Sequence, residues 1–259
     1  MKHDTKHRSH RIDTKALHAG NPRSWMAGLA GALLMGSAHA ALLEVTNPSF
    51  ELPATPSGTF ITGAPPTGWA NYGFIETFVG RDVGVLNPAG TLLYPNPVPD
   101  GSNVAVVFLL TGGPTESGIQ QTLTDTLQAG LRYTLEVSVG NIAPDGGPWN
   151  FAGFPGYRVD LLAGGQLIAS DNNTLLPGEG EFLESTVSVV VGADHLLLGQ
   201  PLGIRLVSLD GPTGIEVNFD NVRLNAVAVP EPATSGLAAA GLLGVLAVWN
   251  RRRRDRRNV

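Results

Sequence analysis

A series of short segments rich in β-branched residues, each closed by a turn, most constrains the fold of this chain. No stretch before residue 233 repeats apolar residues at helical spacing. Turns such as Ala163-Gly164-Gly165 and Asp210-Gly211-Pro212 separate the segments. Strands at this spacing predict an all-β jelly-roll β-sandwich. The expected strands are 103–110, 118–127, 131–139, 157–162, 166–169, 182–191, 203–209 and 215–224.

The composition agrees with one all-β domain. Gly counts 33, Pro 19 and charged residues 15%, as expected for many short strands joined by turns. Residues 41–228 are long enough for a single core and show neither an internal repeat nor a break in composition. Cys is 0, which excludes disulfides, thiol chemistry and cysteine-ligated zinc.

The first 40 residues have the features of a secretory signal peptide. Six Lys and Arg residues precede the apolar stretch WMAGLAGALLMGS, which is too short to span a bilayer. Ala38-His39-Ala40 fits the small-x-small cleavage rule, so we predict cleavage before Ala41. A disordered basic arm on a cytoplasmic protein is the alternative, but it leaves both this site and the C-terminal apolar segment unexplained.

The C-terminal end predicts one short transmembrane helix. Residues 233–249 carry no charge, and in helical form they would extend about 25 Å, against a bilayer core of about 30 Å. The arginines that follow would stay on the cytoplasmic side. With the signal peptide removed, the body of the chain would then lie outside the inner membrane.

The same end resembles the PEP-CTERM sorting signal of Gram-negative bacteria. Residues 229–259 combine the Pro-Glu-Pro motif, the apolar span and an arginine cluster, formed by Pro230, Glu231, Pro232, Arg251, Arg252, Arg253 and Arg254. The resemblance implies recognition by exosortase, a membrane protease, with transient anchoring in the inner membrane. Release to the cell surface or extracellular matrix would follow, in the context of exopolysaccharide and biofilm. An ordinary single-span anchor is the alternative, but it does not account for Pro-Glu-Pro.

The net charge of −5 averages unlike parts of the chain. Residues 41–229 contain five Arg, no Lys and 18 Asp plus Glu, which gives a net charge of −13. Because nucleic-acid binding needs a cationic surface, we expect no nucleic-acid partner. A neutral polysaccharide is a better expected partner than an anionic one, unless cations bridge the two.

Two stretches at opposite ends of the body resemble the first and last strands of galactose-binding-like jelly rolls, a group that includes carbohydrate-binding modules. They are Asn47-Pro48-Ser49-Phe50-Glu51 and Asn218-Phe219-Asp220-Asn221-Val222-Arg223-Leu224. The intervening sequence also resembles the bodies of other PEP-CTERM proteins. In many such jelly rolls two acidic residues at these places share a structural calcium, which implies Glu51 and Asp220 here. Ordinary surface carboxylates are the alternative.

An aromatic loop is the candidate binding site for sugar. The segment 146–157 holds Trp149, Asn150, Phe151, Phe154 and Tyr157 among Gly and Pro, and aromatic faces stack on pyranose rings. The alternative is that these rings cap the core under long loops. For Trp69, in a second aromatic cluster, we favour the core.

No motif in the body indicates catalysis. His195 is the only histidine after the signal peptide, and no HExxH, P-loop or GxGxxG is present. A pair of glycosidase carboxylates leaves no spacing signature. We therefore expect an exported protein without enzymatic activity whose sandwich binds carbohydrate. A structural surface protein with protein partners is the alternative, and a small glycan-active enzyme is a third hypothesis.

Overall fold

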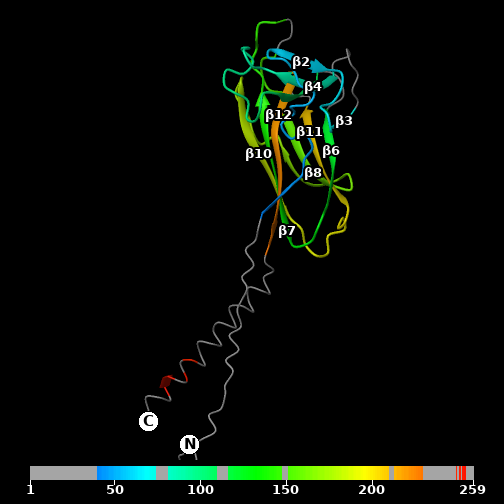
Figure 1. The fold of residues 1–259 in the computed structure, drawn as a ribbon, viewed down its shortest axis with the longest axis vertical. Helices are drawn as coiled ribbons and strands as arrows, with labels where there is room; N and C mark the ends of the chain where they lie inside the picture. Colours follow the sequence, from blue (N-terminus) through cyan, green and yellow to red (C-terminus); the bar gives the residue numbers. More distant parts are fainter. Residues whose placement is uncertain are drawn as a thin grey trace, which may run out of the picture. The chain divides into compact units, whose positions relative to one another are not determined.

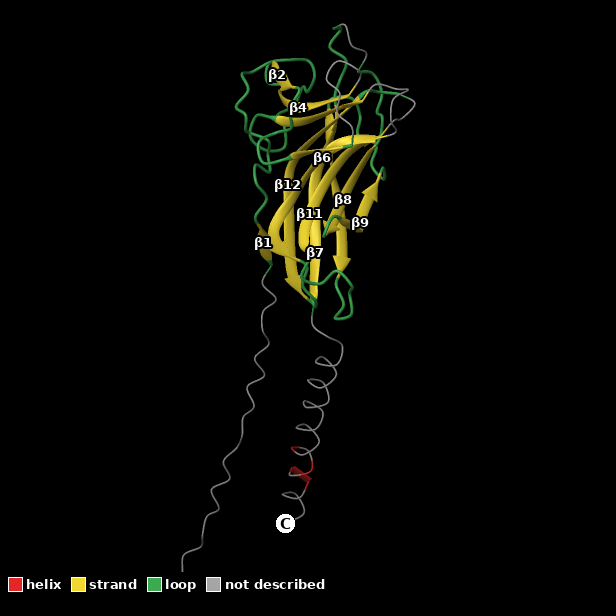
Figure 2. Cartoon of the chain, turned by 90° about the vertical axis from the view of Figure 1, so that its right-hand side faces the viewer, coloured by secondary structure: helices red, strands yellow, loops and turns green. Residues whose placement is uncertain are grey.

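The computed structural model describes residues 40–73, 81–109, 116–147, 151–209 and 213–229, together with residues 249, 251, 253 and 254. In these described residues, twelve strands form two antiparallel sheets that face each other, as the two views show (Figures 1 and 2). This confirms the predicted all-β jelly-roll β-sandwich.

The larger sheet, sheet A, has the strand order β10-β7-β12-β5-β4-β2, with β1 paired to the end of β12. Its strands are β1 Ala41–Leu43, β2 Thr59–Thr62, β4 Arg81–Asn87, β5 Val104–Leu109, β7 Leu131–Asn141, β10 Glu181–Val190 and β12 Glu216–Ala228.

The smaller sheet, sheet B, has the strand order β3-β6-β11-β8-β9. Its strands are β3 Ala70–Tyr72, β6 Glu116–Thr126, β8 Tyr157–Ala163, β9 Gln166–Asn172 and β11 Pro201–Leu209. All eight expected strands are present, and the four strands that precede residue 88 were not predicted from the sequence.

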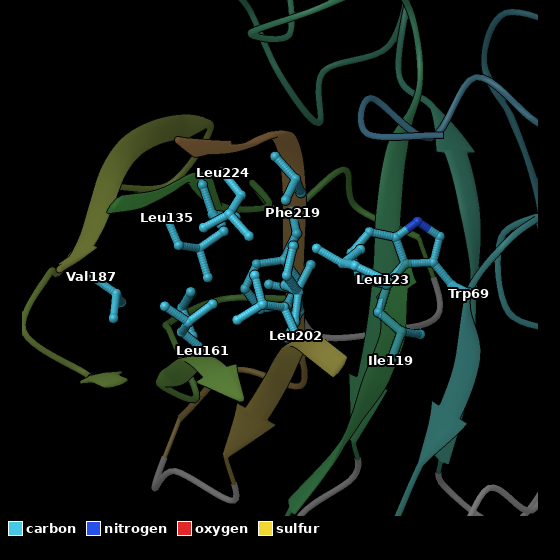
Figure 3. Close-up of a cluster of buried hydrophobic side chains, with 14 of the residues drawn as sticks. Trp69, Ile119, Leu123, Leu135, Leu161, Val187, Leu202, Phe219 and Leu224 are labelled. Atoms are coloured by element: carbon cyan, nitrogen blue, oxygen red, sulfur yellow. The ribbon is translucent and has the colours of Figure 1, made fainter. Parts of the chain in front are cut away.

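The core lies between the sheets. Alternate residues of β7, such as Leu135 and Val137, meet Leu161 and Leu206 from sheet B, and all four are fully buried. Figure 3 shows Leu135 and Leu161 among the core side chains that converge from both layers, with Trp69 at one margin. Trp69 is therefore a core residue, as expected, because its ring packs at 5.3 Å from that of Phe50.

A β-bulge in β12 sets which residues of that strand face outward. Val217 and Phe219 face the core before the bulge, and Leu224 and Ala226 face it afterwards. The core-facing positions change from odd to even residue numbers because the pairing register with β7 shifts between Asp220 and Arg223. Before the bulge, the polar residues Glu216, Asn218 and Asp220 alternate with Val217 and Phe219, so they lie on the outer face of sheet A.

Candidate functional site

The outer face of sheet A carries a second apolar cluster, separate from the core. Loop residues before β5 and after β7 pack over β4 and β5, and they include Leu93, Tyr94, Val98, Ile142 and Phe151. We call this group the outer cluster; its members are Leu86, Leu93, Tyr94, Val98, Val104, Val106, Phe108, Ile142, Phe151 and Phe182. Phe108, Phe151 and Phe182 are only partly buried, so aromatic surface remains exposed at its margin.

Two aromatic rings of the outer cluster lie across a glycine of β7. The rings of Tyr94 and Phe182 stack with centroids 4.6 Å apart. A Cβ atom at residue 140 would overlap the Phe182 ring and lie 2.7 Å from Tyr94 Oη. Gly140 is therefore required here for the close approach of both rings to the sheet.

A chain of buried hydrogen bonds runs beneath these rings. The Tyr94 hydroxyl donates to Asn218 Oδ1 at 2.7 Å. The Asn218 amide donates to Glu216 Oε1 at 2.9 Å and to the Ala105 carbonyl at 3.1 Å. Asn218 thus has its orientation fixed on both sides and in turn holds the Glu216 carboxyl in place.

The carboxyl group of Glu216 is buried and has a pKa near neutral pH. Its residue is only 6% exposed, and burial together with the charge of Asp82 raises its pKa to about 7, against the opposing hydrogen bond from Asn218. Burial and the charge of Glu216 also raise the pKa of Tyr94 well above its usual value. A carboxyl group that exchanges its proton near neutral pH is suited to general acid catalysis.

A second acidic group lies at the bulge of β12. Asp220 is fully buried, and its oxygens accept the backbone N–H groups of Asp100 at 2.9 Å and Asn221 at 2.7 Å. Burial and the nearby charges of Asp100 and Glu51 raise the pKa of Asp220 to about 8, against those two hydrogen bonds. Glu51 Oε1 accepts the N–H groups of Ser102 and Asn103, both at 2.8 Å.

The backbone around these carboxylates is unusual. Asn47, Phe50 and Asn221 all have positive φ, at 51°, 56° and 53°. Such values are rare for a bulky residue such as Phe50, and they persist only where the surroundings enforce them. The conformation brings the segment before Glu51 against β12.

The oxygen atoms around Glu51 and Asp220 provide some, but not all, of the ligands that a hard cation such as calcium needs. Asn103 is 1% exposed, and its Oδ1 has no hydrogen-bond partner among the described residues. Calcium takes carboxylate, amide and backbone oxygens. No group of three or more His, Cys, Asp or Glu in the described ranges is close enough to hold a metal ion. An ion bound by Glu51 and Asp220 would therefore need amide or backbone oxygens as well.

The structure divides the predicted sugar platform. Phe151 packs on the outer cluster, whereas Phe154 and Tyr157 pack on the core, with their rings 6.2 Å apart. Tyr157 is fully buried, and its hydroxyl donates to Asp171 at 2.5 Å. Trp149 and Asn150 lie outside the described residues.

The remaining predicted residues are not members of the outer cluster. His195 stays within its own loop, where its Nδ1 accepts the Leu197 N–H at 3.2 Å. The Arg253 guanidinium lies 3.8 Å from the centroid of the Trp249 ring, as a cation–π pair. Arg251 and Arg254 are also helical and exposed. Pro230, Glu231, Pro232 and Arg252 lie outside the described residues.

Helices that could cross a membrane are absent from the part of the chain that the structure describes. The expected span at 233–249 falls outside that part, apart from Trp249.

Glu216, Asn218 and Tyr94 were not predicted as site residues from the sequence. A signal was available in EVNFD, where Glu216, Asn218 and Asp220 alternate with Val217 and Phe219. That alternation places three polar side chains on one face of a strand. Tyr94 had no such signal, because it lies in a loop that is far from Glu216 and Asn218 in the sequence.

Known families account for both parts of the chain. The HpiC1-like family model, described as HpiC1 cyclase, matches residues 41–225. The model of the PEP-CTERM protein-sorting motif matches residues 228–254, which confirms the predicted sorting signal and marks the chain for export. A search of curated proteins finds no significant match.

Solved cyclases have the same fold. The Stig cyclase Fisc from Fischerella sp. TAU, in complex with (3Z)-3-(1-methyl-2-pyrrolidinylidene)-3H-indole, is 35% identical, with a TM-score of 0.69 over 74% of this chain and 100% of that one. A cyclase from Fischerella sp. TAU with 4-(1H-indol-3-yl)butan-2-one is 34% identical, with a TM-score of 0.67 over the same shares. An apo cyclase from Fischerella sp. is 34% identical, with a TM-score of 0.68 over 74% and 98%.

These matches correct the expectation that the protein is not an enzyme. The expectation rested on the absence of catalytic motifs from the sequence, and a pair of glycosidase carboxylates was the one carboxyl-based chemistry left open. A general acid needs none of these motifs, because one buried carboxyl is sufficient when its surroundings raise its pKa. Burial of that kind arises from loop packing, which the local sequence does not display.

Proposed function

The chain belongs to the HpiC1-like cyclase family, and on this basis we propose that its exported sandwich is a cyclase with Glu216 as the general acid. Glu216 donates a proton to an unsaturated carbon, and the resulting cation closes a ring on an electron-rich neighbour. The observation that carries the proposal is the buried carboxyl of Glu216, whose pKa of about 7 keeps a proton available at neutral pH.

The neighbours of Glu216 have defined tasks in this reaction. The Asn218 amide donates to Oε1, which leaves Oε2 as the oxygen that carries the proton. Tyr94 fixes Asn218 through its hydroxyl. The rings of Tyr94, Phe108 and Phe182 exclude water and stabilise positive charge on the substrate.

The proposed substrate is an indole with an unsaturated side chain. Two of the solved relatives hold indole compounds. The partly buried aromatic rings of the outer cluster suit a flat bicyclic aromatic group, which packs against such surfaces by offset or edge-to-face contact. A neutral substrate also avoids repulsion from a body whose charge is −13.

The test uses 3-(4-methylpent-3-enyl)indole with the full chain purified in detergent. Protonation of its alkene gives a tertiary cation that closes a six-membered ring on indole C2. We expect the fused tricyclic product, and a rate at least about 100-fold lower for Glu216→Gln, since general acids contribute that much or more. Binding of 4-(1H-indol-3-yl)butan-2-one, measured by calorimetry, should be unchanged.

Asp194→Asn is the matched control, because Asp194 is an exposed acid in the loop after β10. It should keep the wild-type rate. A folded protein that binds the indole ketone but forms no product contradicts the proposal. So does a Glu216→Gln variant that cyclises the probe at the wild-type rate.

Export sets where this enzyme works. Exosortase is the proposed partner, which reads Pro230-Glu231-Pro232 while residues 233–249 hold the chain in the inner membrane. The matched sorting motif supports this order of events. The enzyme then acts at the cell surface or outside the cell.

Calcium is the proposed structural ion. Glu51 and Asp220 would hold it, with Asp100 and Asn103 as further oxygen donors. Its contribution would be to neutralise buried negative charge where the first segment meets β12, and no step of the reaction involves it.

Binding of a neutral polysaccharide remains a prediction from the sequence. It depends on Trp149 and Asn150, and of the proposed platform only Phe151 lies on the outer cluster. The cyclase proposal does not require it.

A further inference from the structure

Besides Asp220, the carboxylate of Asp82 shares the outer face of sheet A with Glu216. Asp82 in β4 pairs directly with Phe108 in β5, and Phe108 pairs directly with Glu216 in β12. Directly paired residues of an antiparallel sheet project on the same side. The order across the sheet is therefore carboxylate, aromatic ring, carboxyl.

The spacing of these two groups suits a bicyclic substrate. Asp82 and Glu216 are two strands apart, which corresponds to about 10 Å between their backbones. Phe108 between them is partly buried and belongs to the outer cluster. A flat aromatic substrate bound at this row of the outer face would therefore have one acidic group at each side.

Asp82 is held in a fixed orientation but keeps contact with solvent. Its Oδ1 accepts the N–H groups of Gly63 at 2.7 Å and Val83 at 2.8 Å. The residue is partly exposed, whereas Glu216 is 6% exposed. A group that must release a proton to water after each turnover requires such access.

We propose that Asp82 is the catalytic base that removes the proton when the ring closes. This inference rests on the proposed function, in which Glu216 supplies the first proton. The Glu216 proton forms a new C–H bond at the alkene, and the cation forms a C–C bond to indole C2. The C2–H bond then breaks, its electrons restore the aromatic ring, and the proton moves to Asp82.

The reaction is an isomerisation, so it needs no oxidant or further reactant. Each turnover transfers one proton from Glu216 to Asp82 through the substrate. Asp82 then loses its proton to solvent, and Glu216 regains one. The cycle explains why two carboxyl groups of different exposure lie on one apolar face.

The test compares Asp82→Asn with wild type, using 3-(4-methylpent-3-enyl)indole and its C2-deuterated form. Asparagine keeps the acceptor for Gly63 and Val83, so the fold should be retained. We expect the cyclisation rate to fall about 100-fold, within the range for general bases. A primary isotope effect at C2 should appear or increase, because proton removal becomes the slow step. In D2O, recovered substrate should carry deuterium at the alkene carbon, since the cation reverts.

A purely electrostatic role for Asp82 gives a different result. Three groups of the described chain face Glu216, namely Asp82, Asn218 and Tyr94, and removing the Asp82 charge would lower the pKa of Glu216. The variant would then regain the wild-type rate at acidic pH and show no isotope effect at C2. That result overturns the proposal.

Further variants distinguish a failure of the Asp82 assignment from a failure of the proposed cyclase function. Asp82→Glu should recover part of the rate, and Asp194→Asn should leave it unchanged. If Glu216→Gln abolishes cyclisation while Asp82→Asn cyclises normally, only the base assignment fails. If wild-type protein binds the indole ketone without cyclising the probe, both the function and the base assignment fail.

Discussion

The outer faces of the two sheets both bury acidic groups, but they treat them differently. On sheet B, Arg158 lies 2.5 Å from Glu116 and 3.0 Å from Asp160, and Arg205 lies 3.7 Å from Asp160. On sheet A, neither Glu216 nor Asp220 takes part in any ion pair of the described residues.

The acidities of these groups follow from that difference. The hydrogen bond from Arg158 holds the pKa of Glu116 below its usual value. Burial raises the pKa of Asp160, and the hydrogen bonds and charge of Arg158 oppose it. No cation of the described residues opposes the effect of burial on the pKa of Glu216. A buried acid with an arginine partner contributes to architecture, whereas one without a partner is available for proton transfer or ion binding.

The largest expected effect on stability comes from removing the arginine that pairs with the acids on the outer face of sheet B. Arg158→Met leaves Asp160, whose side chain is 2% exposed, with only the longer contact to Arg205. Removing one partner of a buried pair costs about 3 to 5 kcal/mol of unfolding free energy. Urea unfolding measures it.

Arg132→Met is the control for that change, since Arg132 is exposed on β7. Its effect should stay within about 0.5 kcal/mol. Equal midpoints for the two variants would mean that the ion network of sheet B does not stabilise the fold.

Substitution of Glu216, which forms no ion pair with the described residues, should change stability in the opposite direction. The pKa of Glu216 rises from 4.5 to about 7 on folding, so its contribution to stability is fully present below pH 4.5 and is lost as pH rises through 7. Glu216→Gln should therefore stabilise the protein above pH 7 by about 3 kcal/mol relative to acidic pH. The same substitution abolishes the proposed activity, which is the trade expected of an active site.

Unfolding of Glu216→Gln and wild type at pH 8 and pH 4.5 measures this effect. A difference between the two proteins that does not change with pH would show that the carboxyl titrates alike in both states. Asp194→Asn controls for loss of a negative charge, because Asp194 is exposed.

The sequence predicted the fold better than the site, for physical reasons. β7 and β12 were predictable because β-branched residues alternate over many positions. β1, β2 and β3 have only three or four residues each, too few for a period to be visible. Register then decides which charges meet, so no local pattern announces that Arg158 contacts Glu116.

The site depended on information that the sequence holds only globally. Asp220 and Glu51 were found through a resemblance, and the structure places their charges near each other. Glu216 belongs to no sequence motif, and its pKa is raised because loops bury its side chain. Asp82 became relevant only when β4, β5 and β12 were aligned.

The smallest of the expected effects tests the second unpaired acid. If calcium binds at Asp220, adding it at a hundred times its Kd should stabilise the full chain by about 2.7 kcal/mol. Asp220→Asn should lose this response, and it should also remove the cost of ionising a buried carboxyl whose pKa is about 8. Thermal unfolding with calcium or with a chelator measures both effects. Asp194→Asn should keep the full response. Were calcium to leave wild type unchanged, Asp220 would instead be a carboxyl that stays protonated near neutral pH and is satisfied by the N–H groups of Asp100 and Asn221. Glu216 and Asp220 would then both be buried carboxyl groups that hold a proton near neutral pH. Only the aromatic side chains around Glu216 would distinguish it as the site of catalysis.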